Sequence, residues 1–345
     1  MRAFGPPVAK VRLKSQPDDF IVDELPNWSP SGAGEHDVLL ITKIGCNTQW
    51  VARQLARYAD CRERDVGYAG MKDRHARTTQ WFSVWRGNRS VDWQALSLEG
   101  VVLQAVHAHH RKLRPGTLRG NRFTLRLPLV DPAAASQLAD VLAPRLEQLK
   151  TRGIPNFFGE QRFGRESRNL LLAQRLAQGQ RLRRNELNFA VSAARAALFN
   201  ALLALRITQQ TWLQARVGDA LILDGSNGFF VIQDEAEALD SQRRIDAGDV
   251  HPSGPLWGDD APALGQDVLA EEQHIAAQLP DMVAACTAAR ARHQRRALRV
   301  FPTALDARLD DAVVTLSFEL PAGAYATMLV DQLFEVTQEA DGLVS

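Results

Sequence analysis

Residues 122–129 alternate strictly between polar and apolar side chains, and this period of two constrains the fold more than any other feature of the chain. Successive side chains of a β-strand point to opposite faces, so the pattern puts Phe123 and three leucines on one face. Arg122, Thr124 and Arg126 share the other face. The segment therefore predicts a half-buried strand whose exposed side is basic, as in a sheet that lines a groove for RNA.

Further strands and helices follow from local patterns in the first half of the chain. Residues 37–42 and 80–85 have the composition of strands. Asn47 is a suitable N-cap for a helix in which apolar residues recur at i, i+4 and i+7. Asp131 and Pro132 begin another helix, which extends to Leu149. The first half is therefore predicted to mix α and β structure.

The composition changes at a Gly-Ile-Pro break after residue 152. The segments 170–182 and 190–205 are rich in Ala, Leu and Arg and predict helices, and 224–228 has the residues of a hairpin turn. Strand character returns at 313–318, followed by a helix from about residue 324. The simplest architecture is a mixed α/β domain interrupted by an inserted domain, with boundaries near 154 and 300.

Positive charge is concentrated in three segments, although the net charge of the chain is only +1. Segregated charge of this kind can present a local field that attracts a polyanion, although each segment alone is typical of a solvated face. No run of apolar residues is uncharged and long enough for a membrane span, and none serves as a signal peptide. Three separated cysteines give no metal-binding spacing, so we expect a cytoplasmic protein with reduced thiols.

Residues 67–76 form the segment most informative about chemistry, because Asp73 stands among Lys72, Arg74 and His75. Cationic neighbours lower the pKa of a carboxylate, so Asp73 should be ionised and able to act as nucleophile or base. The three cations could equally bind a phosphate backbone. Taken by composition alone, the segment would more often be an exposed charged turn.

Motifs spread in order along the chain resemble those of the tRNA pseudouridine synthase D family. The catalytic-loop motif is Gly-Met-Lys-Asp-Arg-His-Ala, and it is preceded by an N-terminal pattern that begins at Lys14 and includes Phe20. The other matching segments are Gly-Cys-Asn-Thr at 45–48, Lys-Leu-Arg at 112–114, Gly-Asn-Arg-Phe at 120–123, Gly-Ile-Pro-Asn-Phe-Phe-Gly-Glu-Gln-Arg-Phe-Gly at 153–164, 192–200 and Leu-Pro-Ala-Gly-Ala-Tyr-Ala-Thr at 320–327. Their collinearity makes a chance match very improbable.

The resemblance implies an α+β fold and a reaction. The catalytic domain would have a mixed, mostly antiparallel sheet formed by 1–153 and 300–345, interrupted by an α/β insertion domain, 154–299. The substrate would be the uridine at position 13 in the D arm of tRNA, isomerised to pseudouridine without metal or organic cofactor. We expect a monomer with no obligate protein partner.

The resemblance also assigns residues. Asp73 is the implied nucleophile or base, and Lys14 is its charge partner. Phe20 and Tyr325, which stands where the family has phenylalanine, would contact a flipped-out base, Asn121 would hydrogen-bond its edge, and Phe123 would pack beneath. Each of these aromatic residues alone would more often belong to a hydrophobic core. The residues expected to bind RNA are Lys72, Arg74, His75, Arg111, Lys112 and Arg162.

Three alternative functions would require other residues. A metal-dependent phosphoesterase could use the histidines at 107, 109 and 110 with Asp73 and His75, but it lacks a nearby acidic partner or an HD pair. A binding protein that had lost catalysis would be favoured by a missing Asp73, Lys14 or Asn121, and all three are present. A nucleotide-binding enzyme is disfavoured, because the chain has no phosphate-binding loop motif.

Overall fold

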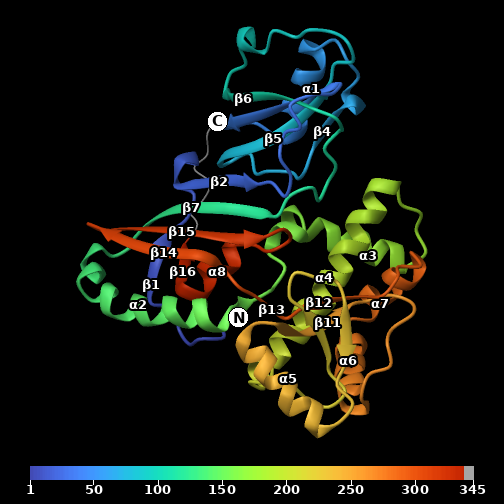
Figure 1. Ribbon diagram of the computed structural model, residues 1–345. Helices are drawn as coiled ribbons and strands as arrows, with labels where there is room; N and C mark the ends of the chain where they lie inside the picture. The colour runs from blue at the N-terminus through green and yellow to red at the C-terminus, as the bar shows by residue number, and fades with distance from the viewer. Residues whose placement is uncertain (338–345) are drawn as a thin grey trace. The chain divides into compact units, whose positions relative to one another are not determined.

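The alternating segment lies in strand β7 (Gly120–Pro128), near the middle of an eight-stranded sheet (Figure 1). The computed structural model describes residues 1–337. Phe123 and Leu125 are buried and Arg122 and Arg126 are exposed, which confirms the predicted pattern. In order, the sheet contains β14 (Thr303–Asp310), β15 (Val313–Pro321), β7, β2 (Phe20–Leu25), β5 (Arg77–Trp85), β3 (His36–Lys43) and β6 (Val101–His109), with β4 (Val66–Tyr68) also paired to β5.

The sheet is mixed, because β2 pairs in parallel with β5 while the other described pairs of this sheet are antiparallel. In the antiparallel pair of β2 and β7, Phe20 lies opposite Leu125, and Glu24 lies opposite Asn121. Side chains two residues apart in a strand point to the same face. The same face of the sheet therefore carries Phe20, Glu24, Asn121 and Phe123.

Contacts divide the chain into two units. The unit that holds this sheet, here called the sheet unit, comprises Pro7–Lys150, Pro302–Gly323 and the described residues from Leu333 onward. The helical unit comprises Met1–Pro6, Thr151–Phe301 and Ala324–Gln332. The segment expected as an insertion, 154–299, thus packs with both a short N-terminal piece and a short piece near the C-terminus. Residues 338–345, the end of the expected segment 300–345, lie outside the described residues.

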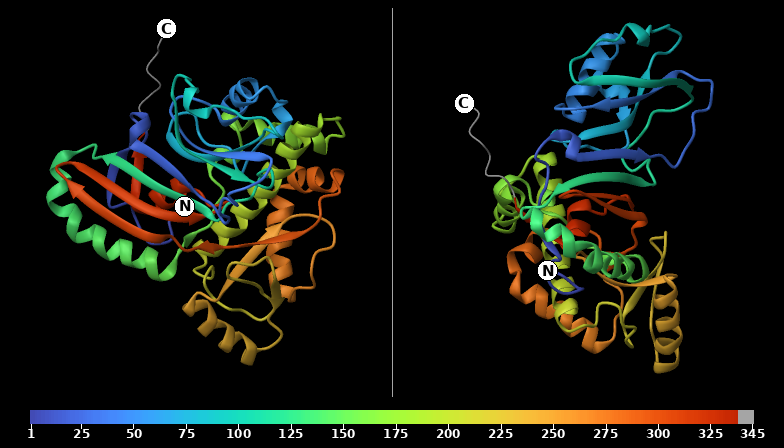
Figure 2. Two further views of the ribbon diagram at one scale, coloured as in Figure 1. Left: turned by 45° about the horizontal axis from the view of Figure 1, so that its top comes forward. Right: turned by 90° about the vertical axis from the view of Figure 1, so that its left-hand side faces the viewer.

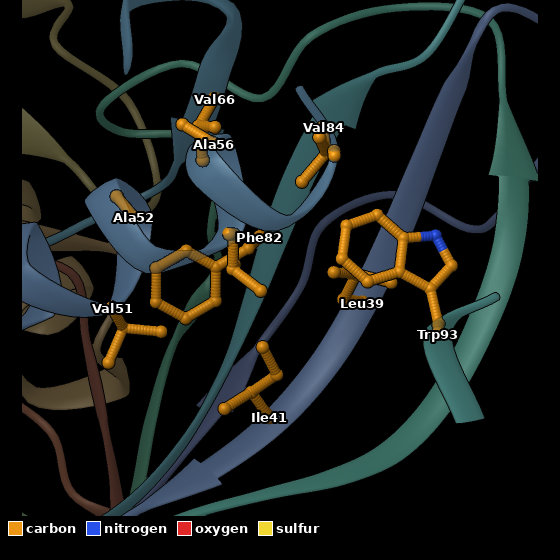
Figure 3. Packing of buried hydrophobic residues seen from close by; sticks show 11 residues of the cluster. Leu39, Ile41, Val51, Ala52, Ala56, Val66, Phe82, Val84 and Trp93 are labelled. Carbon is orange, nitrogen blue, oxygen red and sulfur yellow. The ribbon is translucent and has the colours of Figure 1, made fainter. Parts of the chain in front are cut away.

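Helix α1 (Thr48–Tyr58) covers one face of the sheet beside β4 and β5 (Figures 1 and 2). It begins after Asn47, as predicted, although the Asn47 side chain makes no capping hydrogen bond. Figure 3 shows Val51 and Ala52 of this helix packed near Phe82 of β5 and Ile41 of β3. Each such large apolar side chain contributes about 1.5–3 kcal/mol when fully buried, so this core holds the helix firmly on the sheet.

The remaining elements of the sheet unit follow the predicted signals with one adjustment. Asp131 Oδ1 accepts a hydrogen bond from the Ala133 N–H, as a cap should, but the first turn is a 3-10 turn, η4 (Pro132–Ala134). The helix α2 (Ala135–Arg152) follows and buries four leucines. The other described elements are β1 (Ala9–Arg12), which pairs in parallel with β16 (Phe334–Thr337), and the 3-10 turns η1 (Pro17–Asp19), η2 (Glu63–Asp65) and η3 (Trp93–Ala95).

The helical unit is α+β, where the sequence predicted an α/β insertion. Its four-stranded sheet has the order β10-β9-β11-β12, and the described pairs of this sheet are all antiparallel. The predicted hairpin joins β9 to β10. The elements are β8 (Ile154–Pro155), η5 (Glu160–Arg162), η6 (Arg165–Ser167), α3 (Arg168–Ala177), α4 (Arg184–Thr208), β9 (Ala220–Leu223), β10 (Phe229–Val231), α5 (Glu235–Ala247), β11 (Val250–Leu256), α6 (Gln266–Gln278), α7 (Pro280–Ala288), β12 (Gln294–Ala297), β13 (Arg299–Val300) and α8 (Ala326–Leu333).

Helix α4 is the core helix of the helical unit. By length and composition alone it could cross a membrane, although the sequence patterns predict no span. However, 56% of its most apolar window is buried, and it packs against α3, α6, α7 and β11. Its apolar character is therefore accounted for by the core that it forms.

Candidate active site

The segment between β4 and β5 is anchored on several sides, which makes it an ordered loop. The Lys72 backbone N–H donates to Thr48 Oγ1 over 3.0 Å, and the Thr48 hydroxyl donates to Gln80 Oε1 over 2.9 Å. Gln80 Nε2 in turn donates to the carbonyl oxygen of Gly70, 3.2 Å away. Thr48 starts α1 and Gln80 lies within β5, so two regular elements fix the loop. A loop fixed in this way holds its charged side chains in defined positions.

Asp73 and Lys14, 59 residues apart in the sequence, form an ion pair in which Lys14 Nζ lies 2.5 Å from Asp73 Oδ2. The other carboxylate oxygen accepts the His75 backbone N–H over 3.0 Å. Burial by itself would raise the pKa of the Asp73 carboxyl group. The hydrogen bond and charge of Lys14, together with His75, more than offset burial and lower the pKa below its ordinary value. The carboxylate is thus ionised at neutral pH and partly open to solvent.

Lys14 has an unusual backbone conformation. Its φ is 62°, in the left-handed region that a lysine enters at a cost of about 1–2 kcal/mol. Its ammonium group also lies 4.3 Å from the centre of the Phe20 ring. Strain of this kind is retained where the surrounding structure requires it, often at functional sites. The strained turn directs the Lys14 side chain to Asp73 and Phe20 together.

Lys72 lies inside the protein and joins two neighbouring strands. Its Nζ lies 3.2 Å from Glu24 Oε2 and 2.6 Å from Asn121 Oδ1, the two residues that face each other in the β2–β7 register. The Lys72 side chain is only 7% exposed and that of Glu24 is fully buried. Burial raises the pKa of Glu24, and Lys72 opposes this rise. Lys72 therefore holds the Asn121 oxygen in place, while contact of its ammonium group with RNA stays a prediction.

Substitution within this network tests its contribution to stability. Lys72→Met leaves the Glu24 carboxylate buried without its cation, so we expect the free energy of unfolding to fall by about 3–5 kcal/mol. Glu24→Leu should cost a similar amount, whereas the double variant should recover much of it. Urea unfolding of the three variants measures the coupling. Strictly additive losses would show that the two side chains do not stabilise each other.

Lys43, at the end of β3, is a site residue that the sequence patterns do not predict. Its fully buried ammonium group donates to the carbonyl oxygens of Cys46 and Asp73, over 2.8 and 3.1 Å. Burial lowers the pKa of Lys43 to about 8, although Cys46 and Asp73 oppose the change. The contact to Asp73 fixes the backbone that carries the carboxylate. The available signal was a lysine that ends an otherwise apolar strand.

Phe20 and Phe123 lie together, with ring centroids 6.2 Å apart at a steep angle, and Phe123 stacks on Phe318 at 5.3 Å. They are only 5% and 7% exposed. Phe123 therefore has the core position that its alternating strand suggested. Phe20 lies between this aromatic core and Lys14, so its ring links the hydrophobic interior to the ion pair.

Tyr325 and Arg162 contact each other in the helical unit. Arg162 Nε donates to Tyr325 Oη over 2.9 Å, and Arg162 Nη1 donates to Ser192 Oγ over 2.8 Å. The hydroxyl group that distinguishes Tyr325 from the expected phenylalanine thus has a specific partner. Gly159 lies so close that an added Cβ would come within 2.9 Å of the Tyr325 ring. The signature at 153–164 therefore packs directly on this tyrosine.

The other residues expected to bind RNA have different surroundings. Arg74, His75 and Arg111 are exposed, and Arg74 Nε donates to the Gly45 carbonyl oxygen over 2.9 Å. Lys112 donates to the Arg64 carbonyl oxygen and lines a pocket of about 770 Å³ together with Trp85. Three arginines and two aspartates also line this pocket: Arg62, Arg64, Arg89, Asp60 and Asp65.

Several of the basic residues found from the sequence have structural roles instead of facing solvent. Arg295 and Glu272 form a buried ion pair at 2.9 Å, and burial lowers the pKa of Arg299 to about 10. Arg122 faces solvent, but its charge is paired with that of Glu319 at 2.7 Å. His109 is buried against Trp28, and burial lowers its pKa. Only some of the residues in the three basic segments are therefore candidates for binding RNA.

Comparison with a solved structure defines the class of fold. A crystal structure from Methanosarcina mazei, described as tRNA pseudouridine synthase D, superposes with a TM-score of 0.75 over 98% of this chain and 96% of that one. Sequence identity is 18%, so this similarity is evidence for the fold alone. The chain shares the α+β architecture with its large mixed sheet.

Sequence comparisons identify the family. The family model described as tRNA pseudouridine synthase D (TruD) matches residues 5–181 and 176–333. The tRNA pseudouridine synthase D of Methylococcus capsulatus is 41% identical over 97% of this chain and 94% of its own length. That of Nitrosococcus oceani is 43% identical over 99% of this chain and 95% of its own length. The chain belongs to the tRNA pseudouridine synthase D family, a family of isomerases.

Proposed function

We propose that this protein isomerises uridine to pseudouridine at position 13 in the D arm of tRNA, with Asp73 as the catalytic carboxylate. The observation that carries the proposal is the ion pair of Asp73 with Lys14. Asp73 lies on an anchored loop, and the Lys14 ammonium group also contacts the Phe20 ring. Ionised carboxylates of this kind serve as nucleophiles or bases. Family membership and the similarity to the named relatives support the choice of substrate.

The reaction breaks the N1–C1′ bond of uridine, turns the detached base and joins its C5 to C1′. No atoms are gained or lost by the nucleoside, because the hydrogen released from C5 is matched by one gained at N1. Asp73 would either attack C1′ or remove the 2′ proton to give a glycal-like intermediate. Either role requires the ionised form, which Lys14 favours by lowering the pKa of Asp73.

The target base has to leave its stack to reach Asp73, as in other enzymes that act on a nucleobase. We propose that the Asn121 amide binds an edge of the flipped uracil while its oxygen is held by Lys72. Phe20, Phe123 and Tyr325 would supply the apolar surroundings. Segment 154–299 would act as the family-specific insertion domain, and the protein would work as a cytoplasmic monomer.

The assay that tests the proposal uses purified protein and an unmodified tRNA transcript labelled with tritium at C5 of uridine. Isomerisation releases this hydrogen to water, and carbodiimide primer extension locates the product. Tritium release with a stop at position 13 is the expected outcome. A protein that binds the transcript and releases no tritium would instead be the binding-only alternative.

Metal removal gives a second check. The proposed chemistry uses Asp73, Lys14 and bound water or substrate groups, so we expect tritium release to stay within about twofold of its initial rate after EDTA treatment, since no metal-activated water is invoked. The rate before and after chelation is measured, with re-addition of Mg²⁺ as the control for tRNA folding. A loss that zinc or manganese alone restores would favour the metal-dependent phosphoesterase alternative.

A further inference from the structure

The helical unit contains a pocket of about 590 Å³ to which the proposed chemistry assigns no role. Four arginines line it, namely Arg162, Arg195, Arg292 and Arg296, and no Asp or Glu occurs among its described lining residues. This volume is within the range of ligand-binding pockets in proteins, about 300–1,000 Å³. A pocket with so one-sided a charge favours an anion. We call it the arginine pocket.

Two of the arginines of the pocket, Arg162 and Arg195, are positioned by neutral groups. Arg162 donates to the hydroxyl oxygens of Ser192 and Tyr325, while Arg195 Nε donates to the Trp257 carbonyl oxygen over 2.8 Å. Arg195 also donates to the Arg292 carbonyl oxygen. Hydrogen bonds to neutral groups orient the guanidinium groups of Arg162 and Arg195 without neutralising their charge. A fork of guanidinium donors matches the oxygens of a phosphate group.

One wall of the pocket comes from α4, otherwise the apolar core helix. Asn188, Ser192 and Arg195 follow each other at spacings of four and three residues, which places them on one face of the helix. Leu187 and Val191 of the same helix also line the pocket, so the polar side chains stand among apolar ones. The three polar side chains give this wall hydrogen-bonding groups that suit a polar ligand.

The aromatic ring in the pocket is not available to a nucleobase. Phe158 is 8% exposed, and the guanidinium groups of Arg296 and Arg162 lie 4.1 and 5.1 Å from its centre. Both arginines are therefore held against the ring, and a base would find no free aromatic face there. A phosphate group, which needs only donors and positive charge, fits the lining better.

We propose that the arginine pocket binds a backbone phosphate of the tRNA substrate. The inference rests on the proposed function for the identity of the ligand, and it adds a binding site built from Arg162, Arg195, Arg292 and Arg296. Phosphate contacts position an RNA without reading its sequence. The pocket should therefore contribute to affinity and KM, and not to the chemical step.

The test measures binding of an unmodified tRNA transcript by fluorescence anisotropy at several salt concentrations. Arg292→Gln should weaken binding about tenfold, because a charge-assisted phosphate contact is lost, and should reduce the slope of log K against log salt by about 1. Arg292→Lys should lie between this variant and the original protein, since it keeps the charge and loses the fork. Arg292 is exposed, so its replacement should not unfold the protein.

The matched control is Arg243→Gln, which removes the same charge from an exposed position of α5 in the same unit but outside the pocket. Thermal unfolding confirms that all variants are folded. Tritium release should show a raised KM and an unchanged kcat for Arg292→Gln. Equal affinity and equal salt slope for Arg292→Gln and Arg243→Gln would overturn the inference. Absence of pseudouridine formation in every protein, with the binding difference intact, would overturn only the proposed function.

Discussion

Asp73→Asn is expected to abolish tritium release from labelled tRNA, with a loss of about 10⁴-fold or more in kcat, as for removal of a catalytic nucleophile or base. Asparagine has nearly the shape of aspartate and can still accept a hydrogen bond from Lys14. It has no negative charge with which to attack C1′ or remove a proton. Affinity for tRNA should change by less than about threefold, because the cations that we propose to face a phosphate backbone stay in place.

Asp18→Asn is the matched control for this prediction. It changes a carboxylate of the same unit that is 55% exposed and pairs with Arg77 on the surface. This variant should retain the original kcat and the original affinity. Turnover by Asp73→Asn at more than a few per cent of the original rate would contradict the catalytic assignment.

Lys14→Met should lower kcat/KM by about 10²–10³-fold while leaving the protein folded, because the carboxylate loses the cation that keeps it ionised and oriented. Methionine would bear the same backbone strain at this left-handed position as lysine, and thermal unfolding of the variant checks that it is folded. Lys14→Arg should recover part of the activity, since it restores the charge with a different geometry. Steady-state kinetics of the two variants measures the difference.

The pH profile separates this role of Lys14 from a merely structural one. In the original protein the pKa of Asp73 is lowered, so its ionised form, and any stability that it contributes, is lost only as pH falls through that lowered pKa. Without Lys14, burial remains as the largest influence and raises the pKa. The acidic limb of kcat/KM should therefore move to higher pH in Lys14→Met. An unmoved limb would show that Lys14 does not set the ionisation of Asp73.

Much of the fold could be predicted from local patterns. The alternation at 122–129 predicted the buried and exposed faces of β7, and this strand also places Asn121 on the face that carries Phe123. Asn47 and Asp131 marked helix starts correctly to within a turn. Asp73 and Lys14 were paired by their family motifs, and the structure brings them to 2.5 Å. Local patterns succeed here because they report which side chains share a face.

Partners of buried charges could not be predicted, because they depend on contacts between distant segments. The burial of the Glu24 carboxylate in β2 is explained only by Lys72, which the loop between β4 and β5 brings beside it. Lys43 is explained by the two carbonyl oxygens that it binds. Arg295 belonged to a basic segment in the sequence and proves to be paired with Glu272 inside the helical unit. Charge counts along a chain do not distinguish these positions from a surface that binds RNA.

The most direct measurement of the central claim is carbodiimide primer extension on tRNA from cells that lack this protein. The cells are complemented with the original gene or with Asp73→Asn at equal protein levels. We predict that the stop at position 13 is absent without the protein, returns with the original gene and stays absent with Asp73→Asn. Return of the stop with Asp73→Asn, or its persistence in cells without the protein, would contradict the account.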